Sequence, residues 1–325
     1  MAESLSGPLA EAPQAKAAPF HDPRTFVTHA YKEHSADLGE MQMNYAEAGS
    51  PSNPALLLIP GQTESWWGYE KAMALLEKDF HVFAVDLRGQ GRSTWTPGRY
   101  TIDNMGNDLV RFIATVIGKP VITSGCSSGG VISAWLSAFA LPGQLRGAIY
   151  EDPPLFACLP SPLVGPSIKQ AIGPFLHLQA VHLGDQWRIG DWQGFRQAMA
   201  ESPSPLMRML KPPEEPPQNI KEYDPEWGRS FWEGTVAQSC PPEVMLPQVK
   251  VPVLLTHHMR IIVPDTGNLI GAMSDMQAAK VRDLVAQSGQ TLEYLSLPTA
   301  AHALHNADAT QFADIVTRWT KQHVS

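Results

Sequence analysis

The sequence predicts an α/β fold built on a mostly parallel sheet. Short continuous apolar runs recur along the chain, as expected of strands buried on both faces. Segments with helical periodicity follow most of these runs. The alternation stops at residue 153 and resumes near residue 249. We therefore expect one sheet-based core, residues 23–152 and 248–325, with a helical cap inserted at residues 153–247.

The first half of the core supplies its elements in regular order. Residues 1–22 are rich in Ala, Pro and small polar residues, which predicts a disordered arm. Residues 25–48 predict a two-stranded hairpin. Buried strands are expected at 55–61, 81–89, 120–125 and 145–152. Helices are expected at 66–79, at 101–118 with Thr101 as the N-cap, and at 128–140.

The cap and the last part of the core follow. Residues 153–247 contain many prolines and three helical stretches, with tryptophans at 187, 192, 227 and 232. The core then resumes with a strand at 249–258, a helix at 274–289, a strand at 291–298 and a final helix at 308–323.

Composition excludes several classes of function. The net charge of -8 argues against nucleic acid as a partner. No apolar run reaches the roughly 18–20 residues that span a bilayer, and the N-terminus lacks the apolar region of a secretory signal. Three scattered cysteines indicate a reducing, cytoplasmic location without a disulfide framework. Because C-x-x-C and H-E-x-x-H are absent from the sequence, we expect no metal.

Ser127 is the candidate nucleophile. It stands at the centre of G-C-S-S-G, residues 125–129, which fits G-x-S-x-G. Alone this pattern is weak, and the alternative is a turn of small residues. Its position between a buried strand and a helix favours a nucleophile lifted to the carboxyl edge of the sheet.

A serine hydroxyl needs a base, and the base in turn needs a carboxylate. His302 and His305 both follow the last strand, so both are candidates, and we prefer His302. Asp152 is our preferred acid, because it ends a strand and two prolines fix it. The alternatives for the acid are its neighbour Glu151 and two later residues, Asp265 and Asp275.

Two backbone N–H groups should stabilise the oxyanion. Ser128, directly after the nucleophile, would supply one, and Gln62, in the loop after the strand at 55–61, the other. Trp66 and Trp67 follow Gln62 closely. We expect one of them in the core and one at the substrate pocket, with Trp66 as the candidate contact.

These residues resemble the α/β-hydrolase superfamily from about residue 40 onward. D-L-R-G-Q-G-R-S at 86–93 matches its D-x-R-G-x-G-x-S loop, and the interval from His302 to Phe312 fits its final loop and helix. This interval favours His302 over His305. In most members of this superfamily, the acid that orients the histidine follows the penultimate strand. This chain resembles the subset of members that carry the acid one strand earlier, which supports Asp152. The resemblance implies a mostly parallel eight-stranded sheet flanked by helices.

A closer resemblance is to bacterial zearalenone lactone hydrolases. It covers M-N-Y-A-E-A-G-S-P, the Q-T…S-W-W loop and, within the cap, K-E-Y-D-P-E-W-G-R. The resemblance implies cleavage of the ester of a macrocyclic resorcylic lactone, after which the acid product loses carbon dioxide. It implies no cofactor. It also suggests Trp187 as a ligand contact, since the similar enzymes carry a tryptophan in that cap segment.

A cap rich in Trp, Met, Pro and Leu suits a bulky, apolar small molecule. Two alternatives to a resorcylic lactonase stay open. One is a general carboxylesterase or another lactonase, and the other is a small-molecule receptor on the same fold. A homo-oligomer also stays open at this stage.

Overall fold

The computed structural model describes residues 27–158, 165–183, 190–204, 207–208 and 210–324. Its centre is an eight-stranded sheet in which only the pairs β1–β2 and β2–β4 are antiparallel. In spatial order the strands are β1 (Glu33–Asp37), β2 (Gln42–Ala48), β4 (His81–Val85), β3 (Ala55–Ile59), β5 (Val121–Cys126), β6 (Leu145–Glu151), β7 (Val253–His257) and β10 (Leu292–Ser296). The predicted mostly parallel sheet is confirmed.

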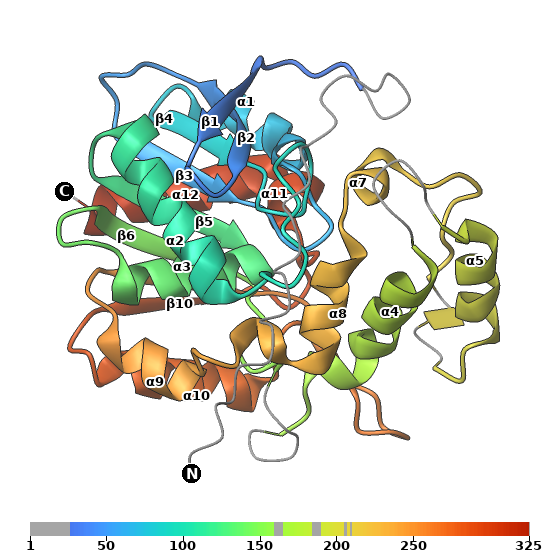
Figure 1. Cartoon of the computed structure of the whole chain (residues 1–325). Helices are drawn as coiled ribbons and strands as arrows, with labels where there is room; N and C mark the ends of the chain where they lie inside the picture. Colours follow the sequence, from blue (N-terminus) through green and yellow to red (C-terminus); the bar gives the residue numbers. More distant parts are fainter. Residues whose placement is uncertain (1–26, 159–164, 184–189, 205–206, 209, 325) are drawn as a thin grey trace, which may run out of the picture.

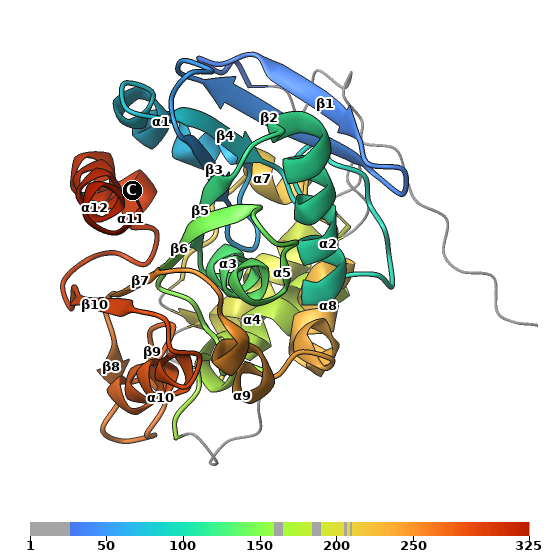
Figure 2. The ribbon, with the colours of Figure 1, turned by 90° about the vertical axis from the view of Figure 1, so that its left-hand side faces the viewer.

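Helices cover both faces of this sheet (Figure 2). α1 (Glu70–Leu76), α11 (Leu304–Ala307) and α12 (Ala309–His323) lie on one face. α2 (Ile102–Phe112), α3 (Ser128–Phe139) and α10 (Asp275–Ala286) lie on the other. Alternate residues of β3 enter the two cores: Leu57 packs with the second group of helices, and Leu56 and Leu58 pack with the first. Burial on both faces explains why these strands are continuously apolar.

Local signals account for several element boundaries. Thr101 caps α2 as predicted, with its hydroxyl accepting from the backbone N–H of Asn104. The helix expected at 101–118 finishes as a π-helix, Ile113–Ile117, and Gly118 closes it in the left-handed conformation. The helix expected at 66–79 begins with a 3-10 turn, Trp66–Tyr69, before α1. Two features were not predicted: the short helix α11, and a hairpin of β8 (Ile261–Ile262) with β9 (Leu269–Ile270) that follows β7.

Most of the segment between β6 and β7 extends to one side of the sheet, and its last part lies beside α10 (Figure 1); we call the described residues of the whole segment the cap. Its main helix, α4 (Ile168–His182), packs against α8 (Pro225–Glu233) and α5 (Trp192–Glu201). Shorter elements complete the segment: α7 (Gln218–Lys221), a 3-10 turn (Thr235–Ala237), α9 (Pro242–Met245) and a 3-10 turn (Leu246–Gln248). The arm expected at 1–22 and Trp187 lie outside the described residues.

In the described part of the chain, we find no helix with the length and apolar character required to cross a bilayer.

Candidate active site

Ser127 occupies a sharp turn between β5 and α3. Its backbone adopts φ 55° and ψ -122°, which is unusual for a residue with a side chain. Close packing makes the flanking glycines necessary: a Cβ on Gly125 would lie 2.1 Å from the Gly129 carbonyl oxygen, and one on Gly129 would lie 2.2 Å from that of Ile59. This is the strained strand-to-helix turn that G-x-S-x-G predicts.

His302 lies in the loop after β10 and pairs with Asp152. The ring Nδ1 is 2.6 Å from Asp152 Oδ2, and Asp152 Oδ1 accepts from the backbone N–H of His258 at 3.0 Å. Asp152 is buried, while the His302 side chain is 48% exposed. Burial would raise the pKa of Asp152, but the hydrogen bond and charge of His302 outweigh it and lower that pKa. Partial desolvation of the His302 ring by the surrounding protein opposes its charged form, yet its pKa is raised because Asp152 stabilises the imidazolium.

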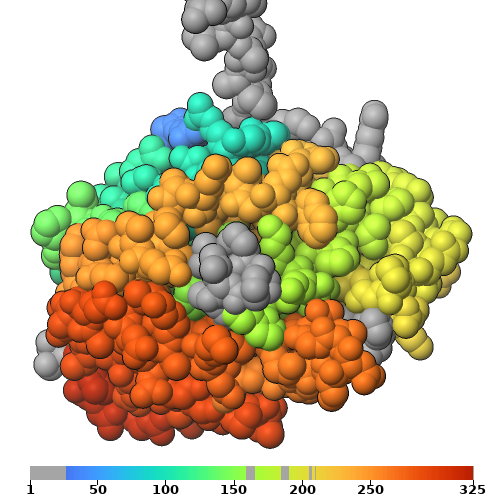
Figure 3. Space-filling view, turned by 90° about the horizontal axis from the view of Figure 1, so that it is seen from below, coloured from blue at the N-terminus to red at the C-terminus, as the bar shows by residue number. Residues whose placement is uncertain are grey.

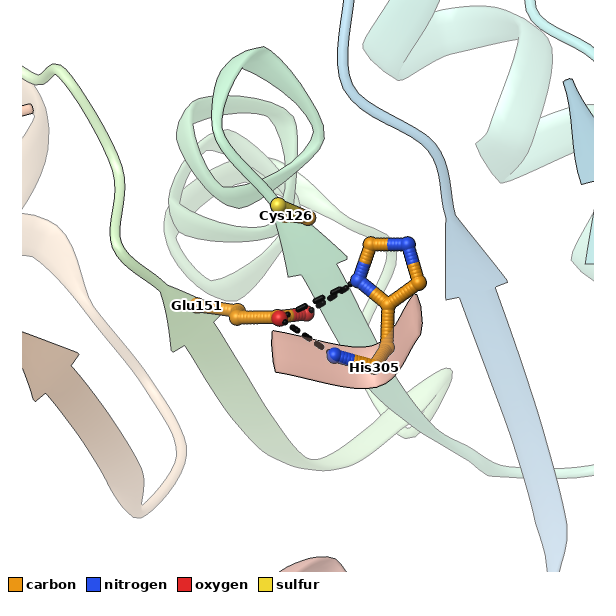
Figure 4. A group of neighbouring side chains, drawn as sticks. All are labelled: Cys126, Glu151 and His305. Atoms are coloured by element: carbon orange, nitrogen blue, oxygen red, sulfur yellow. Dashed lines mark hydrogen bonds and ion pairs between the residues drawn. The ribbon is translucent and has the colours of Figure 1, made fainter. Parts of the chain in front are cut away.

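The neighbouring acid, Glu151, pairs with the other candidate base, His305. Its carboxylate accepts from the backbone N–H of His305 at 3.0 Å and lies 3.0–3.1 Å from Nδ1 of the ring (Figure 4). Both side chains are fully enclosed, and Tyr69 stacks on the imidazole with centroids 4.0 Å apart. The later acids lie elsewhere: Asp265 is exposed near the hairpin, and Asp275 binds Arg260 at 2.6 Å.

Cys126 completes a buried group with Glu151 and His305, whose ligand-type atoms all lie within 4.8 Å of one another (Figure 4). These residue types can hold a metal, but a metal requires a thiolate and a neutral imidazole. Burial raises the pKa of the Cys126 thiol well above its usual value, and Glu151 raises the pKa of His305 against the effect of burial. The electrostatics therefore favour a hydrogen-bonded carboxylate–imidazolium pair beside a protonated thiol.

A cavity of about 400 Å³ opens beside Ser127. Ser127, His302, Gln62 and Ser128 all line it, so the structure brings these four predicted residues to one place. The loop after β3 adjoins the turn directly, since a Cβ on Gly61 would lie 3.2 Å from that of Ser127. A hydroxyl and a carboxylate-bound imidazole on one cavity provide the groups that nucleophilic catalysis requires.

Thr63 and Pro154 also line the cavity, and the rest of its wall is apolar and comes from two sources. The cap contributes Ile168, Ile172, Phe175, Leu176, Leu210 and Phe231. The segment after β7 contributes Met259, Ile270, Gly271 and Ala272. Figure 3 shows the second segment (orange) against the green part of the cap, and β9 packs on α4. None of these ten residues was singled out from the sequence, where only the apolar composition of the cap indicated such a wall.

Trp66 does not line this cavity. It is fully buried, and its indole N–H donates to Glu33 at 2.8 Å. Its backbone N–H donates to Asp86 at 2.7 Å, and its ring packs within the core cluster that contains α1 and α12. The expectation that Trp66 contacts substrate is therefore corrected. Its neighbour Trp67 stacks on His29 instead, with ring centroids 5.7 Å apart.

Comparison with known proteins agrees with this architecture. The family model described as alpha/beta hydrolase fold matches residues 54–176. The chain is 29% identical over 100 residues to the 3-oxoadipate enol-lactonase 2 of Acinetobacter baylyi, covering 30% of this chain and 37% of that protein. It is 30% identical over 125 residues to the bifunctional epoxide hydrolase 2 of Sus scrofa, covering 37% of this chain and 22% of that one. The matches thus span well under half of each relative.

Solved structures extend the likeness to the whole sheet. The E-2-(acetamidomethylene)succinate hydrolase aligns over 90% of this chain and 99% of its own, with a TM-score of 0.62 and 18% identity. The enol-lactonase from Burkholderia xenovorans aligns over 89% of this chain and all of its own, with a TM-score of 0.58 and 18% identity. The chain has the α/β-hydrolase fold, and the family model and hydrolase relatives support its place in the α/β-hydrolase superfamily.

Proposed function

We propose that the protein is a serine hydrolase that opens the ester of a macrocyclic resorcylic lactone. One observation carries the hydrolase part of the proposal. Ser127, in a strained turn, shares a cavity with His302, and His302 is hydrogen-bonded to the buried carboxylate of Asp152. These are the relations among nucleophile, base and orienting acid that recur in serine hydrolases of unrelated sequence.

The proposed reaction has two steps. His302 accepts the proton of Ser127 as its hydroxyl oxygen attacks the lactone carbonyl, and Asp152 holds the resulting imidazolium. Backbone N–H groups of Gln62 and Ser128 stabilise the oxyanion, and the N-terminus of α3 adds a favourable dipole. The ring oxygen leaves with the proton from His302. Water, deprotonated by His302, then releases the acyl group from Ser127.

The choice of substrate rests on the cavity and on resemblance. A largely apolar volume of about 400 Å³ suits a bulky apolar ester. The likeness to zearalenone lactone hydrolases includes the cap segment K-E-Y-D-P-E-W-G-R, and some relatives in sequence and structure are enol-lactonases. No cofactor enters this reaction.

The test is incubation of the purified protein with zearalenone, followed by mass analysis. We expect addition of one water and then loss of carbon dioxide. Ser127→Ala should abolish turnover while the circular dichroism spectrum and melting temperature stay close to those of the wild type. A Ser127→Ala variant with near-normal turnover would refute the assignment.

A panel of simple aryl esters separates the proposal from its nearest rival, a general carboxylesterase or another lactonase. A kcat/KM for aryl esters far above that for the macrolactone favours the rival. Multiple turnovers with product release exclude a pure receptor.

A further inference from the structure

The loop after β3 carries Gln62, whose backbone N–H is proposed above to bind the oxyanion. The next residue, Thr63, has φ 64°, in the left-handed region that a β-branched residue rarely adopts. Such a conformation costs about 1–3 kcal/mol and persists only where surrounding contacts enforce it. The loop therefore needs external support to hold Gln62 and Thr63 in this conformation.

Part of this support comes from the core. Gln90, in the D-L-R-G-Q-G-R-S segment, accepts from the backbone N–H of Thr63 at 2.5 Å. Its amide nitrogen donates to the carbonyl oxygen of Gly61 at 3.2 Å. One buried side chain thus binds the loop on both sides of Gln62.

The remaining support comes from the cap. The hydroxyl of Tyr223 accepts from the side-chain amide of Gln62 at 2.6 Å, and Tyr223 is 1% exposed. Asn219 donates to the carbonyl oxygen of Thr63 at 2.7 Å. Both residues lie in the cap segment 218–224, at more than 150 positions from the loop along the chain.

This cap segment is itself anchored to the core on either side of Tyr223. The backbone N–H of Asp224 donates to Gly89 at 2.8 Å, and its carboxylate accepts from Tyr100 at 2.5 Å. Glu222 lies 3.6 Å from Arg92. The cap segment therefore rests on the same core segment that supplies Gln90, which fixes the position of the Tyr223 hydroxyl relative to the loop.

We propose that Tyr223 and Asn219 are positioning residues, through which the cap holds the oxyanion-binding loop in its working conformation. The proposal rests on the assigned role of Gln62 and extends it: Tyr223 acts through Gln62 rather than on the substrate. A hydrogen-bond donor stabilises the transition state only when the fold holds it in place in advance. Misalignment of such a donor weakens stabilisation of the oxyanion more than it weakens binding of the neutral ester.

The principal test is Tyr223→Phe, which removes the hydroxyl that accepts from the Gln62 side chain and that also interacts with the backbone of Gly228 in the cap. We expect kcat to fall about tenfold, less than the 10²–10³ lost with an oxyanion donor itself, while KM changes by less than about twofold. Affinity for an aryl trifluoromethyl ketone, which forms a tetrahedral adduct with the serine, should fall in proportion to kcat/KM. Asn219→Ala should act in the same direction, and the double variant should lose less than the product of the two single losses.

Tyr150→Phe is the matched control, because Tyr150 is also fully buried and its hydroxyl is 2.6 Å from Ser137, remote from the cavity wall. It should lose stability without losing kcat. Any of three results would overturn the proposal. The kcat of Tyr223→Phe could equal that of the wild type, Tyr150→Phe could lose as much kcat as Tyr223→Phe, or the effect of Tyr223→Phe could be confined to KM.

Amide hydrogen exchange of residues 61–64 separates this proposal from the assigned function, since it needs no turnover. Exchange there should be faster in Tyr223→Phe than in the wild type and in Tyr150→Phe. Faster exchange in a protein that hydrolyses no ester would support the role of Tyr223 in holding the loop and refute the assignment as a serine hydrolase. Unchanged exchange in an active enzyme would refute the role of Tyr223 alone.

Discussion

Two adjacent acids at the end of β6 bind two histidines that are three residues apart. Glu151 is the last residue of β6, and Asp152 directly after it leaves the strand with φ 43°. Asp152 reaches His302 at the cavity, while Glu151 reaches the enclosed His305. The backbone carbonyl of Glu151 also accepts from the N–H of Ser127 at 2.8 Å. One acid therefore faces the reacting groups, and the other supports the structure beneath them.

The roles of the two acids can be separated by pH profiles. His302 must be neutral to accept a proton, so kcat/KM should fall as pH drops through its pKa, which Asp152 raises. Asp152→Asn should lower kcat by about 10⁴, as in comparable triads. Because the hydrogen bond to a carboxylate and its charge are lost, the acidic limb of the residual activity should move to lower pH. Steady-state kinetics between about pH 5 and pH 9 measure both effects.

Glu151→Gln is the matched change for comparison. It breaks a buried ion pair, which typically costs about 3–5 kcal/mol of unfolding free energy. Well below its lowered melting temperature, the variant should keep kcat within about tenfold of the wild type. A loss of kcat as severe as in Asp152→Asn would instead make Glu151 the acid of the triad.

At the scale of elements, the hairpin β8–β9 closes one side of the cavity. Gly271 lines the cavity with φ 143°, and a Cβ there would lie 2.6 Å from the carbonyl oxygen of Met259. Gly271→Ala should push the hairpin and Met259 out of position. We expect KM for a bulky lactone to rise about five- to tenfold, while kcat/KM for a small aryl ester changes little.

Gly267 offers the control for this substitution, since it lies at the turn of the same hairpin with φ 67° and open space around its Cα. Gly267→Ala also places a Cβ on a backbone with positive φ, at a cost of about 1–2 kcal/mol, but Gly267 does not line the cavity. If Gly271→Ala and Gly267→Ala raise the KM of the lactone equally, the cause is loosening of the whole hairpin and not displacement of the cavity wall.

Elements with strong periodicity could be predicted from the sequence, and those that depend on distant contacts could not. The buried strands and α2 follow from local pattern and capping. The hairpin has strands of two residues, too short for any periodicity, although P-D-T-G at 264–267 marks its turn. Trp66 was misplaced for a related reason: its burial depends on Glu33, which lies 33 residues away on β1.

The same contrast holds among the site residues. Ser127 stands in a local motif whose geometry follows from its glycines. The pairing of Asp152 with His302 spans 150 residues, and only strand order and superfamily likeness could indicate it. The ten apolar wall residues depend on how the cap and the hairpin pack, which no pattern within either segment determines.

At the scale of the whole molecule, the cap and the core meet through buried carboxyl groups. Glu222 of the cap adjoins two acids of the core, Asp86 and Glu33. Arg92 lies between the two segments, 3.6 Å from Glu222 and 3.4 Å from Glu33. Gln218 of the cap donates to Glu222 at 3.1 Å. Burial, and then the charge of Asp86, raise the pKa of Glu222 to about 8. Burial also raises the pKa of Asp86, to about 7. Ionisation of Glu222 and Asp86 is therefore disfavoured in the folded protein.

The direction of the pH dependence follows from these values. The pKa of Glu222 is raised from 4.5 to about 8, so between these limits the folded protein binds more protons than the unfolded chain. Its unfolding free energy should consequently fall as pH rises through this window. We expect the melting temperature to be roughly 2–5 °C lower at about pH 9 than at about pH 6. Glu222→Gln, neutral at every pH, should remove much of this difference and should be the more stable protein at about pH 9.

Glu226→Gln isolates the effect of burial from that of net charge. Glu226 also belongs to the cap, but its side chain is 40% exposed and pairs with Arg229 at the surface. Its removal should leave the slope of melting temperature against pH as in the wild type. If the slope of melting temperature against pH is the same in Glu222→Gln and in the wild type, ionisation of Glu222 costs the folded protein no stability. The hydrogen bonds that flank Tyr223 would then hold the cap on the core as firmly at alkaline pH as at neutral pH.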